Sequence, residues 1–419
     1  CDWSSDVCSS DLLMEDSPMK KNLYARISSF LFLMLVGLSS LAFYTNQAKA
    51  WLSTNPSDNQ QLVSEETEDG DDVVNNALKS KMTYIEVNTF IRDALGQNVK
   101  NDNGRLVMKL NNGYLTYYYE RTSDEKINQQ VSCYTDLYQY CKSKDIPMVY
   151  FQAPNKVDPN NPQLPDGYTD NCNDAIDRYL KGLKSNGVPY VDLRTALKND
   201  FDNYYECFFI TDHHWLPETG FWASGKILEY LSDTYNLEYN KTVINENQYS
   251  KRVYNEWFLG SLGKKVGRNW SGVDNITLIY PNFITNLSVE THYVKDKTTH
   301  VTGDFLNSII VQKNLQYRGE YPTSEEMNRK KCYAAYTGGD FPKQIVKNNR
   351  ATNDTKLLIL RDSFACGVTP FLSVAVAETH VLDLRYLPEN FSVQDYINEI
   401  NPDAVLCLFS ETNLVELSQ

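Results

Sequence analysis

Short, continuously apolar runs alternate with helical patterns along most of the chain. The apolar runs, rich in β-branched and aromatic residues, cover residues 147–151, 189–192, 357–360, 380–384 and 404–409. Helical patterns cover residues 126–142, 171–185, 217–233 and 393–400, and the third opens with a proline. Strands that are apolar on both faces suit a parallel sheet covered by helices on both sides. The pattern therefore predicts an α/β fold, a three-layer α/β/α sandwich with a mostly parallel sheet.

Residues 240–350 break this rhythm. They are rich in Gly, Asn and Tyr and show little helical periodicity. We expect a mostly β or irregular insertion there, placed so that it could wall a functional site.

The amino-terminal part has the pattern of an export signal. Residues 1–18 are polar and of low complexity, and we interpret them as a non-native leader ahead of a natural start at Met19. A basic segment then precedes an apolar run over residues 27–43 and a small-x-small cleavage pattern ending at Ala50. The run fits an uncleaved anchor or a cleaved signal peptide, and both place the body outside the cytoplasm.

An acidic stretch over residues 51–78 has too few apolar residues to pack and is expected to be a solvated linker. The catalytic domain would then span residues 79–419, an extracytoplasmic unit held by residues 27–43 or released after cleavage near Ala50.

The overall composition narrows the classes of partner. The chain has 419 residues, of which 42% are hydrophobic, enough for a sizeable core. Its net charge of −14 argues against nucleic acid or an anionic membrane surface as the main partner. The 29 Tyr and 6 Trp suit sugar binding and ordinary cores equally. Nine cysteines without a CxxC pair predict neither a zinc site nor a dense disulfide framework, and we expect no cofactor.

The first candidate motif is Thr211-Asp212-His213-His214-Trp215, just ahead of the helix predicted from residue 217. In an extended segment, Asp212 and His214 would face the same side while His213 points away. Asp212 could then hold the imidazole of His214 in one tautomer, as the acid of a catalytic triad does. Two alternatives remain: a metal site, disfavoured because adjacent histidines splay apart, and helix-start residues with ordinary hydrogen bonds.

The second motif covers residues 357–365, where a buried strand ends in a polar turn and an apolar, helix-like segment. Ser363 would lie at the carboxyl end of a parallel strand, where catalytic groups collect. Alone, Asp362 or Ser363 would simply be a helix N-cap. A nucleophile needs a base and the base needs an orienting acid, so the two motifs together predict catalysis by Ser363, His214 and Asp212.

These two motifs resemble those of the DHHW proteins, relatives of the SGNH-hydrolase-like alginate O-acetylation proteins. Similar segments are Pro154-Asn155-Lys156, residues 258–263 and Asp383-Leu384-Arg385-Tyr386, so the resemblance extends from about residue 84 to the end. Two departures are visible. The Gly-Asp-Ser block of typical SGNH esterases is Arg361-Asp362-Ser363 here, and their Asp-x-x-His is shortened to Asp-x-His.

The resemblance implies an exported enzyme that moves acetyl groups onto hydroxyls of an extracellular polysaccharide. Such enzymes often work beside a multi-spanning membrane acyltransferase that brings acetyl across the bilayer. Asp212, His214 and Ser363 carry over as acid, base and nucleophile. The Gly and Asn of the usual oxyanion hole have no assigned position in this chain.

We therefore expect an extracytoplasmic O-acetyltransferase that works through an acetyl-serine. A carbohydrate acetyl esterase and a non-catalytic polysaccharide-binding assembly subunit are the alternatives. The candidates for substrate contact are Arg361, Arg385, Lys156 and Trp215, although we favour a structural salt bridge for both arginines. The backbone N–H of Ser363 or of its neighbour is the candidate for stabilising an oxyanion.

Overall fold

The structure is a computed structural model that describes residue 34 and residues 81–102, 105–294, 297–319 and 321–410. The chain divides into two units, Cys1–Lys81 and Met82–Gln419, and the elements below belong to the second. The leader, the signal or anchor and the acidic linker inferred over residues 1–78 lie outside the described residues, apart from Met34. Among the helices that are described, none combines the length and the apolar character needed to cross a membrane.

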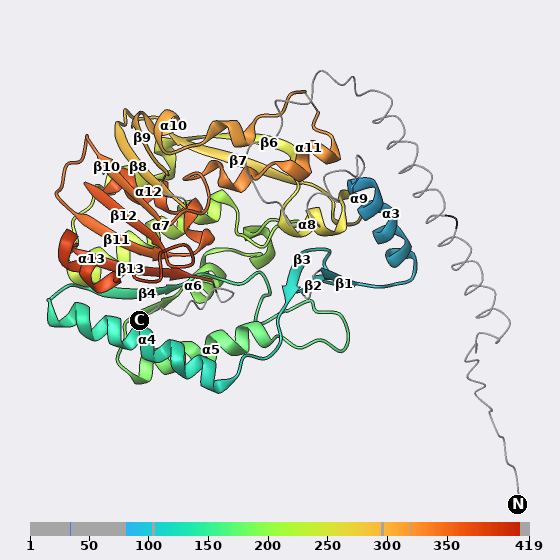
Figure 1. The fold of residues 1–419 in the computed structure, drawn as a ribbon, viewed down its shortest axis with the longest axis horizontal. Helices are drawn as coiled ribbons and strands as arrows, with labels where there is room; N and C mark the ends of the chain where they lie inside the picture. Colours follow the sequence, from blue (N-terminus) through green and yellow to red (C-terminus); the bar gives the residue numbers. More distant parts are fainter. Residues whose placement is uncertain (1–33, 35–80, 103–104, 295–296, 320, 411–419) are drawn as a thin grey trace, which may run out of the picture. The chain divides into compact units, whose positions relative to one another are not determined.

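An eight-stranded sheet forms the centre of the domain, with the strand order β5-β4-β13-β11-β12-β10-β8-β9 (Figure 1). The strands are β4 (Met148–Gln152), β5 (Tyr190–Asp192), β8 (Leu287–Tyr293), β9 (Lys297–Gly303), β10 (Lys343–Asn348), β11 (Lys356–Arg361), β12 (Glu378–Asp383) and β13 (Ala404–Phe409). The first five in this order pair in parallel. The last three are antiparallel to their neighbours. The mostly parallel sheet is confirmed.

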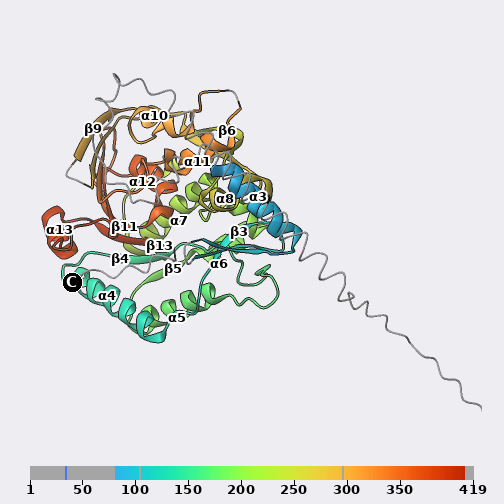
Figure 2. The same cartoon turned by 45° about the vertical axis from the view of Figure 1, so that its right-hand side comes forward.

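Helices cover both faces of this sheet (Figures 1 and 2). One face carries α4 (Asp124–Ser143), α5 (Asn171–Ser185) and α13 (Val393–Ile400), and the other carries α7 (Pro217–Tyr235) and α12 (Thr369–Ala375). Side chains alternate between the two cores: Met148 and Tyr150 of β4 lie in one, Val149 and Phe151 in the other. The predicted α/β/α sandwich is therefore confirmed.

Each of the five strands and four helices expected from the pattern is present, with ends within two residues of those expected. The strands were recognisable because both their faces are buried, which leaves a continuous apolar run.

The stretch over residues 240–350 contains strands, as expected, but it is not a separate insertion, because part of it belongs to the central sheet. Three of its strands, β8, β9 and β10, extend the central sheet. β6 (Tyr249–Phe258) and β7 (Asp274–Pro281) form a two-stranded sheet of their own. Two short helices lie between β6 and β7 in sequence, α8 (Ser261–Val266) and α9 (Arg268–Ser271). Two more lie between β9 and β10, α10 (Phe305–Ser308) and α11 (Ser324–Arg329).

The remaining elements precede or connect these layers. α3 (Lys81–Ala94) leads to a three-stranded antiparallel sheet of β1 (Val99–Asp102), β2 (Arg105–Lys109) and β3 (Leu115–Tyr118), and α6 (Leu193–Asp200) follows β5. The 3₁₀ helices are η1 (Tyr204–Cys207), η2 (Lys241–Ile244), η3 (Glu246–Gln248), η4 (Gln312–Leu315), η5 (Cys332–Ala335) and η6 (Ser363–Gly367).

Helix α7 approaches η6 so closely that glycine is needed at the contact. A Cβ atom on Gly220 of α7 would lie 2.6 Å from the carbonyl oxygen of Gly367, the last residue of η6. Real Cβ atoms do not approach backbone this closely, so any side chain here would separate the two elements. The contact thus sets the position of the segment that begins with Ser363.

Replacing Gly220 with alanine should therefore lower the free energy of unfolding by roughly 1–3 kcal/mol through overpacking. Gly225 provides a matched control in the same helix, because a Cβ there meets nothing within 4 Å. Gly225→Ala should instead stabilise the protein by about 0.5–1 kcal/mol, the ordinary gain from removing a helical glycine. Urea unfolding measures the free energy of unfolding of both variants. Equal changes in the two variants would contradict the close contact at Gly220.

Candidate active site

The structure brings together the three residues that sequence analysis selected as catalytic. His214 Nδ1 lies 2.5 Å from Asp212 Oδ1, and His214 Nε2 lies 2.7 Å from Ser363 Oγ. A carboxylate only accepts hydrogen bonds, so Nδ1 carries the imidazole proton and Nε2 is free to accept from the serine hydroxyl. This is the arrangement of acid, base and nucleophile in a catalytic triad.

Asp212 is buried, and its charge is compensated by donors from two segments. Oδ1 also accepts the backbone N–H of His214 at 3.1 Å, and Oδ2 accepts the backbone N–H of Ser261 at 2.6 Å. Burial alone would raise the pKa of Asp212, but the charges of His214 and His213 and these hydrogen bonds hold it well below its usual range. Asp212 is therefore an ionised carboxylate, placed where it can stabilise an imidazolium on His214.

Ser363 begins η6 directly after β11, in the middle of the central sheet. Asp362 fixes this turn, since its carboxylate accepts the N–H of Phe364 at 2.9 Å and both the N–H and the hydroxyl of Ser410, at 2.6 and 2.8 Å. Asp362 is thus the N-cap that the sequence allowed, and the cap places the serine beside it. The N–H groups of Phe364 and Ala365 already donate to Asp362, which leaves the N–H of Ser363 as the candidate for stabilising an oxyanion.

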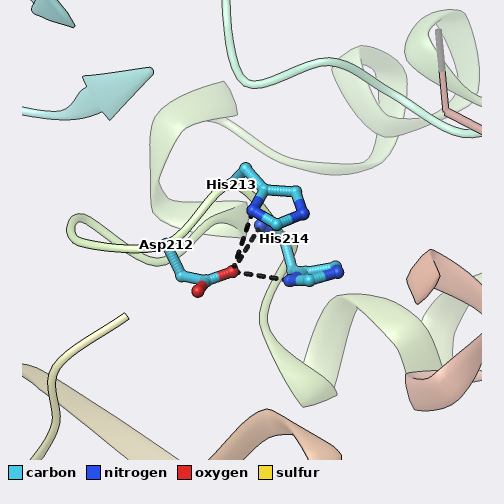
Figure 3. A group of neighbouring side chains, drawn as sticks. All are labelled: Asp212, His213 and His214. Atoms are coloured by element: carbon cyan, nitrogen blue, oxygen red, sulfur yellow. Dashed lines mark hydrogen bonds and ion pairs between the residues drawn. The ribbon is translucent and has the colours of Figure 1, made fainter. Parts of the chain in front are cut away.

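His213 lies in a different position from the one expected. Its Nδ1 is 3.0 Å from Ser261 Oγ and 3.5 Å from Asp212 Oδ1, so the side chain turns back towards the carboxylate (Figure 3). The expectation that His213 points away is wrong, because residues 211–214 form a series of bends and not an extended strand. The two imidazole rings lie side by side, with centroids 3.9 Å apart.

Two buried aromatic residues hold the catalytic segments together. The indole N–H of Trp215 and the hydroxyl of Tyr333 both donate to the carbonyl of Phe364, at 3.1 and 3.2 Å. The ring of Tyr333 also stacks on His214, with centroids 4.1 Å apart. Trp215 is fully buried, so it supports the serine turn and is not placed for the substrate contact that we expected.

Lys156 anchors the loop that carries the acid and the base. Its ammonium group donates to the carbonyl of Leu115 at 2.7 Å, to that of Ile210 at 3.3 Å and to that of Asp212. All three of its N–H donors are thereby used inside the protein. The substrate contact expected for Lys156 does not fit this geometry.

Asp274 holds the same loop by accepting hydrogen bonds from the N–H groups of the loop. Its carboxylate accepts the backbone N–H of Ile210 at 2.7 Å, that of Thr211 at 2.8 Å and the hydroxyl of Thr211 at 2.5 Å. A buried cation therefore binds the carbonyl groups of the loop while a buried anion binds its amide groups. We infer that Lys156 and Asp274 position Asp212 and His214.

The two arginines considered for substrate contact belong to one salt-bridge network. The fully buried Arg361 donates to the carbonyls of Gly339 and Asp362 and lies 3.6 Å from Asp383. Arg385 binds Asp383 through two hydrogen bonds, at 2.8 and 2.6 Å. Both arginines thus have the structural role that we favoured.

The side chains of Asp212, His213 and His214 are also a cluster that could hold a metal ion, with ligand atoms within 4.8 Å of one another. Both oxygens of Asp212 already accept N–H groups, however, and His214 Nδ1 carries a proton. A cation would have to displace these hydrogen bonds. The donor set present fits a proton-transfer triad better than a metal site.

Several supporting residues were missed by sequence reasoning: Gly260, Ser261, Asp274 and Tyr333. Gly260 and Ser261 fall in the segment 258–263, noted for its resemblance but given no role. Asp274 and Tyr333 lie far from the motifs in sequence, and no local pattern marks them. The seven cysteines in the described part of the chain are free thiols.

Gly260 permits the contact between α8 and Asp212, because a Cβ there would lie 2.4 Å from Asp212 Cβ. Gly260→Ala should displace the carboxylate and slow the reaction of Ser363 with an aryl sulfonyl fluoride by about 10²-fold. Intact-mass labelling kinetics measure this rate, with Gly225→Ala as the control. A wild-type labelling rate in Gly260→Ala would show that Asp212 does not need its present position.

Lys156 should give protein stability a distinctive pH dependence. Burial lowers its pKa to about 7, from an ordinary value of 10.5. Between these values the unfolded chain binds more protons than the folded one, so this group makes folding more favourable as pH rises. The destabilisation caused by Lys156→Met should therefore grow from pH 7 towards pH 10, by up to about 1.4 kcal/mol per pH unit. Urea unfolding at several pH values measures this change, and a difference that stays constant with pH would contradict the lowered pKa of Lys156.

Comparison with known proteins is consistent with this architecture. Residues 114–273 match the family described as an SGNH hydrolase-like domain, acetyltransferase AlgX. No curated protein sequence matches the chain.

Solved structures share the fold at low sequence identity. Bacillus cereus PatB1 with a sulfonyl adduct is 21% identical, with a TM-score of 0.59, covering 75% of this chain and 96% of PatB1. A DHHW family protein from Eubacterium siraeum is 18% identical, with a TM-score of 0.54, covering 76% of this chain and 94% of that protein. Residues 114–273 are thus similar to the SGNH hydrolase-like domain described as acetyltransferase AlgX, and the fold is similar to those of PatB1 and a DHHW family protein.

Proposed function

We propose that this protein is a serine-dependent O-acetyltransferase that moves acetyl groups, through an acetyl-Ser363 intermediate, onto hydroxyls of a polysaccharide outside the cytoplasm. The observation that carries the proposal is the continuous hydrogen-bonded series from Asp212 through His214 to Ser363. The match to a domain described as an acetyltransferase supports acyl transfer as the reaction class.

In the first half-reaction, His214 Nε2 takes the proton of Ser363 as Oγ attacks the carbonyl carbon of the acetyl donor. Asp212 stabilises the imidazolium, and the backbone N–H of Ser363 stabilises the oxyanion. The intermediate then collapses, the bond from the carbonyl carbon to the donor oxygen breaks, and that oxygen receives the proton from His214. Acetyl-Ser363 and neutral His214 remain.

In the second half-reaction, His214 takes the proton of a sugar hydroxyl, whose oxygen attacks the acetyl carbon. The bond to Ser363 Oγ breaks, and Oγ recovers a proton from His214. If water attacks instead, the same residues catalyse hydrolysis, which is the esterase alternative. A non-catalytic binding subunit would have no need of the buried carboxylate and its donors, and we disfavour it for that reason.

The setting of the reaction rests on the sequence. The export pattern ending at Ala50 and the anchor candidate over residues 27–43 support an extracytoplasmic enzyme. Such an enzyme has no cytoplasmic acetyl donor within reach, so a membrane acyltransferase that carries acetyl across the bilayer is the partner that we propose. The acceptor in this proposal is a cell-surface or secreted polysaccharide.

Incubation with an aryl acetate should add one acetyl group to Ser363, detectable by intact-mass and peptide mass spectrometry. Ser363→Ala should carry no adduct, while replacement of the exposed Ser143 on α4 should leave the adduct in place. Asp212→Asn should slow acylation by about 10⁴-fold, because the asparagine amide favours the wrong imidazole tautomer. An adduct of equal yield on Ser363→Ala would overturn the proposal.

A further inference from the structure

His213 borders a small pocket that the triad itself does not use. The pocket is also lined by Thr116, Tyr119 and Phe364, the residue that follows Ser363. Its volume is about 20 Å³, room for one water-sized group. The pocket therefore suits a single hydroxyl group next to the catalytic serine.

The neighbours of His213 determine which of its nitrogens carries the proton. Nδ1 lies near the Ser261 hydroxyl and near the Asp212 carboxylate, at 3.0 and 3.5 Å. A bare nitrogen lone pair facing a carboxylate oxygen would be repelled, so Nδ1 carries the proton. Nε2 then presents a lone pair, and no described residue is hydrogen-bonded to it.

His213 stays neutral in the folded protein. Burial and the nearby His214 lower the pKa of its imidazole to about 3. A group with so low a pKa is a poor base but remains a competent hydrogen-bond acceptor. Figure 3 shows the two rings side by side, each with its second nitrogen turned away from Asp212. The site thus has two adjacent imidazole acceptors, of which only the one on His214 is required for proton transfer.

We propose that His213 Nε2 accepts a hydrogen bond from the hydroxyl adjacent to the one being acetylated, so that the acceptor is recognised as a vicinal diol of a sugar. This inference rests on the proposed acetyl transfer. A hydroxyl has one proton, and the attacking hydroxyl gives it to His214, so His213 must be satisfied by a second hydroxyl. Neighbouring sugar carbons carry adjacent hydroxyls, and the two imidazole rings that would receive them are also adjacent, with centroids 3.9 Å apart.

The test compares two acceptors that differ by one hydroxyl, 1,2-cyclohexanediol and cyclohexanol. Acetyl-Ser363 is formed with an aryl acetate, and the rate of transfer to each alcohol is measured from the acetylated products. Loss of one hydrogen bond corresponds to about a tenfold change, so wild type should prefer the diol about tenfold. In His213→Ala the ratio should fall to the statistical value set by the two equivalent hydroxyls of the diol, and in His213→Gln, whose amide oxygen also accepts, it should partly recover.

The readout is a ratio within one protein, so a partial loss of folded enzyme affects both alcohols equally. His292→Ala, which removes a histidine on β8, should keep the wild-type ratio. If wild type forms acetyl-Ser363 but shows no diol preference, or if His213→Ala keeps it, the role of His213 is overturned while the transferase proposal stands. If no acetyl-serine forms in any variant, the proposed function fails and this inference fails with it.

Discussion

The arrangement of the site depends on the burial of one charge, the carboxylate of Asp212. Moving an ionised carboxylate out of water is costly unless hydrogen-bond donors replace the water. Here the donors are the N–H groups of Ser261 and His214 and the Nδ1 proton of His214. Because the buried carboxylate needs a donor, His214 carries its proton on Nδ1. His214 Nε2 can then accept a hydrogen bond from Ser363. Stability and reactivity are coupled at this residue.

The hydrogen bond between His214 and Ser363 forms only where two separate parts of the chain meet. The loop with Asp212 and His214 is held by the buried pair Lys156 and Asp274, whereas the serine turn is held by Asp362 at the end of β11. The contact of α7 with η6 at a glycine, and the hydrogen bonds of Trp215 and Tyr333 to Phe364, join the two parts. The sheet thus places Ser363, and the pair of Lys156 and Asp274 places His214.

Sequence reasoning selected Asp212, His214 and Ser363 because each stands in a local pattern: an Asp-x-His before a helix, and a serine after a buried strand. It could not identify Asp274 or Tyr333, whose partners lie 31 or more residues away in sequence and meet them only after folding. The prediction for His213 was wrong for the same reason. It assumed the alternating side-chain directions of an extended strand, whereas residues 211–214 form bends. The three antiparallel strands of the central sheet were missed because none has a continuous apolar run. β8 and β10 alternate buried and less buried positions, and β9 is a largely exposed edge strand.

The most direct test of the central claim, that Asp212, His214 and Ser363 act as one unit, is a double-mutant cycle on acetyl transfer. The rates of His214→Ala, Ser363→Ala and the double variant are compared with wild type under single-turnover conditions. Residues that act together are strongly non-additive, so the double variant should lose about as much activity as either single variant. If the two losses instead multiply, His214 and Ser363 act independently and the proposed triad is wrong.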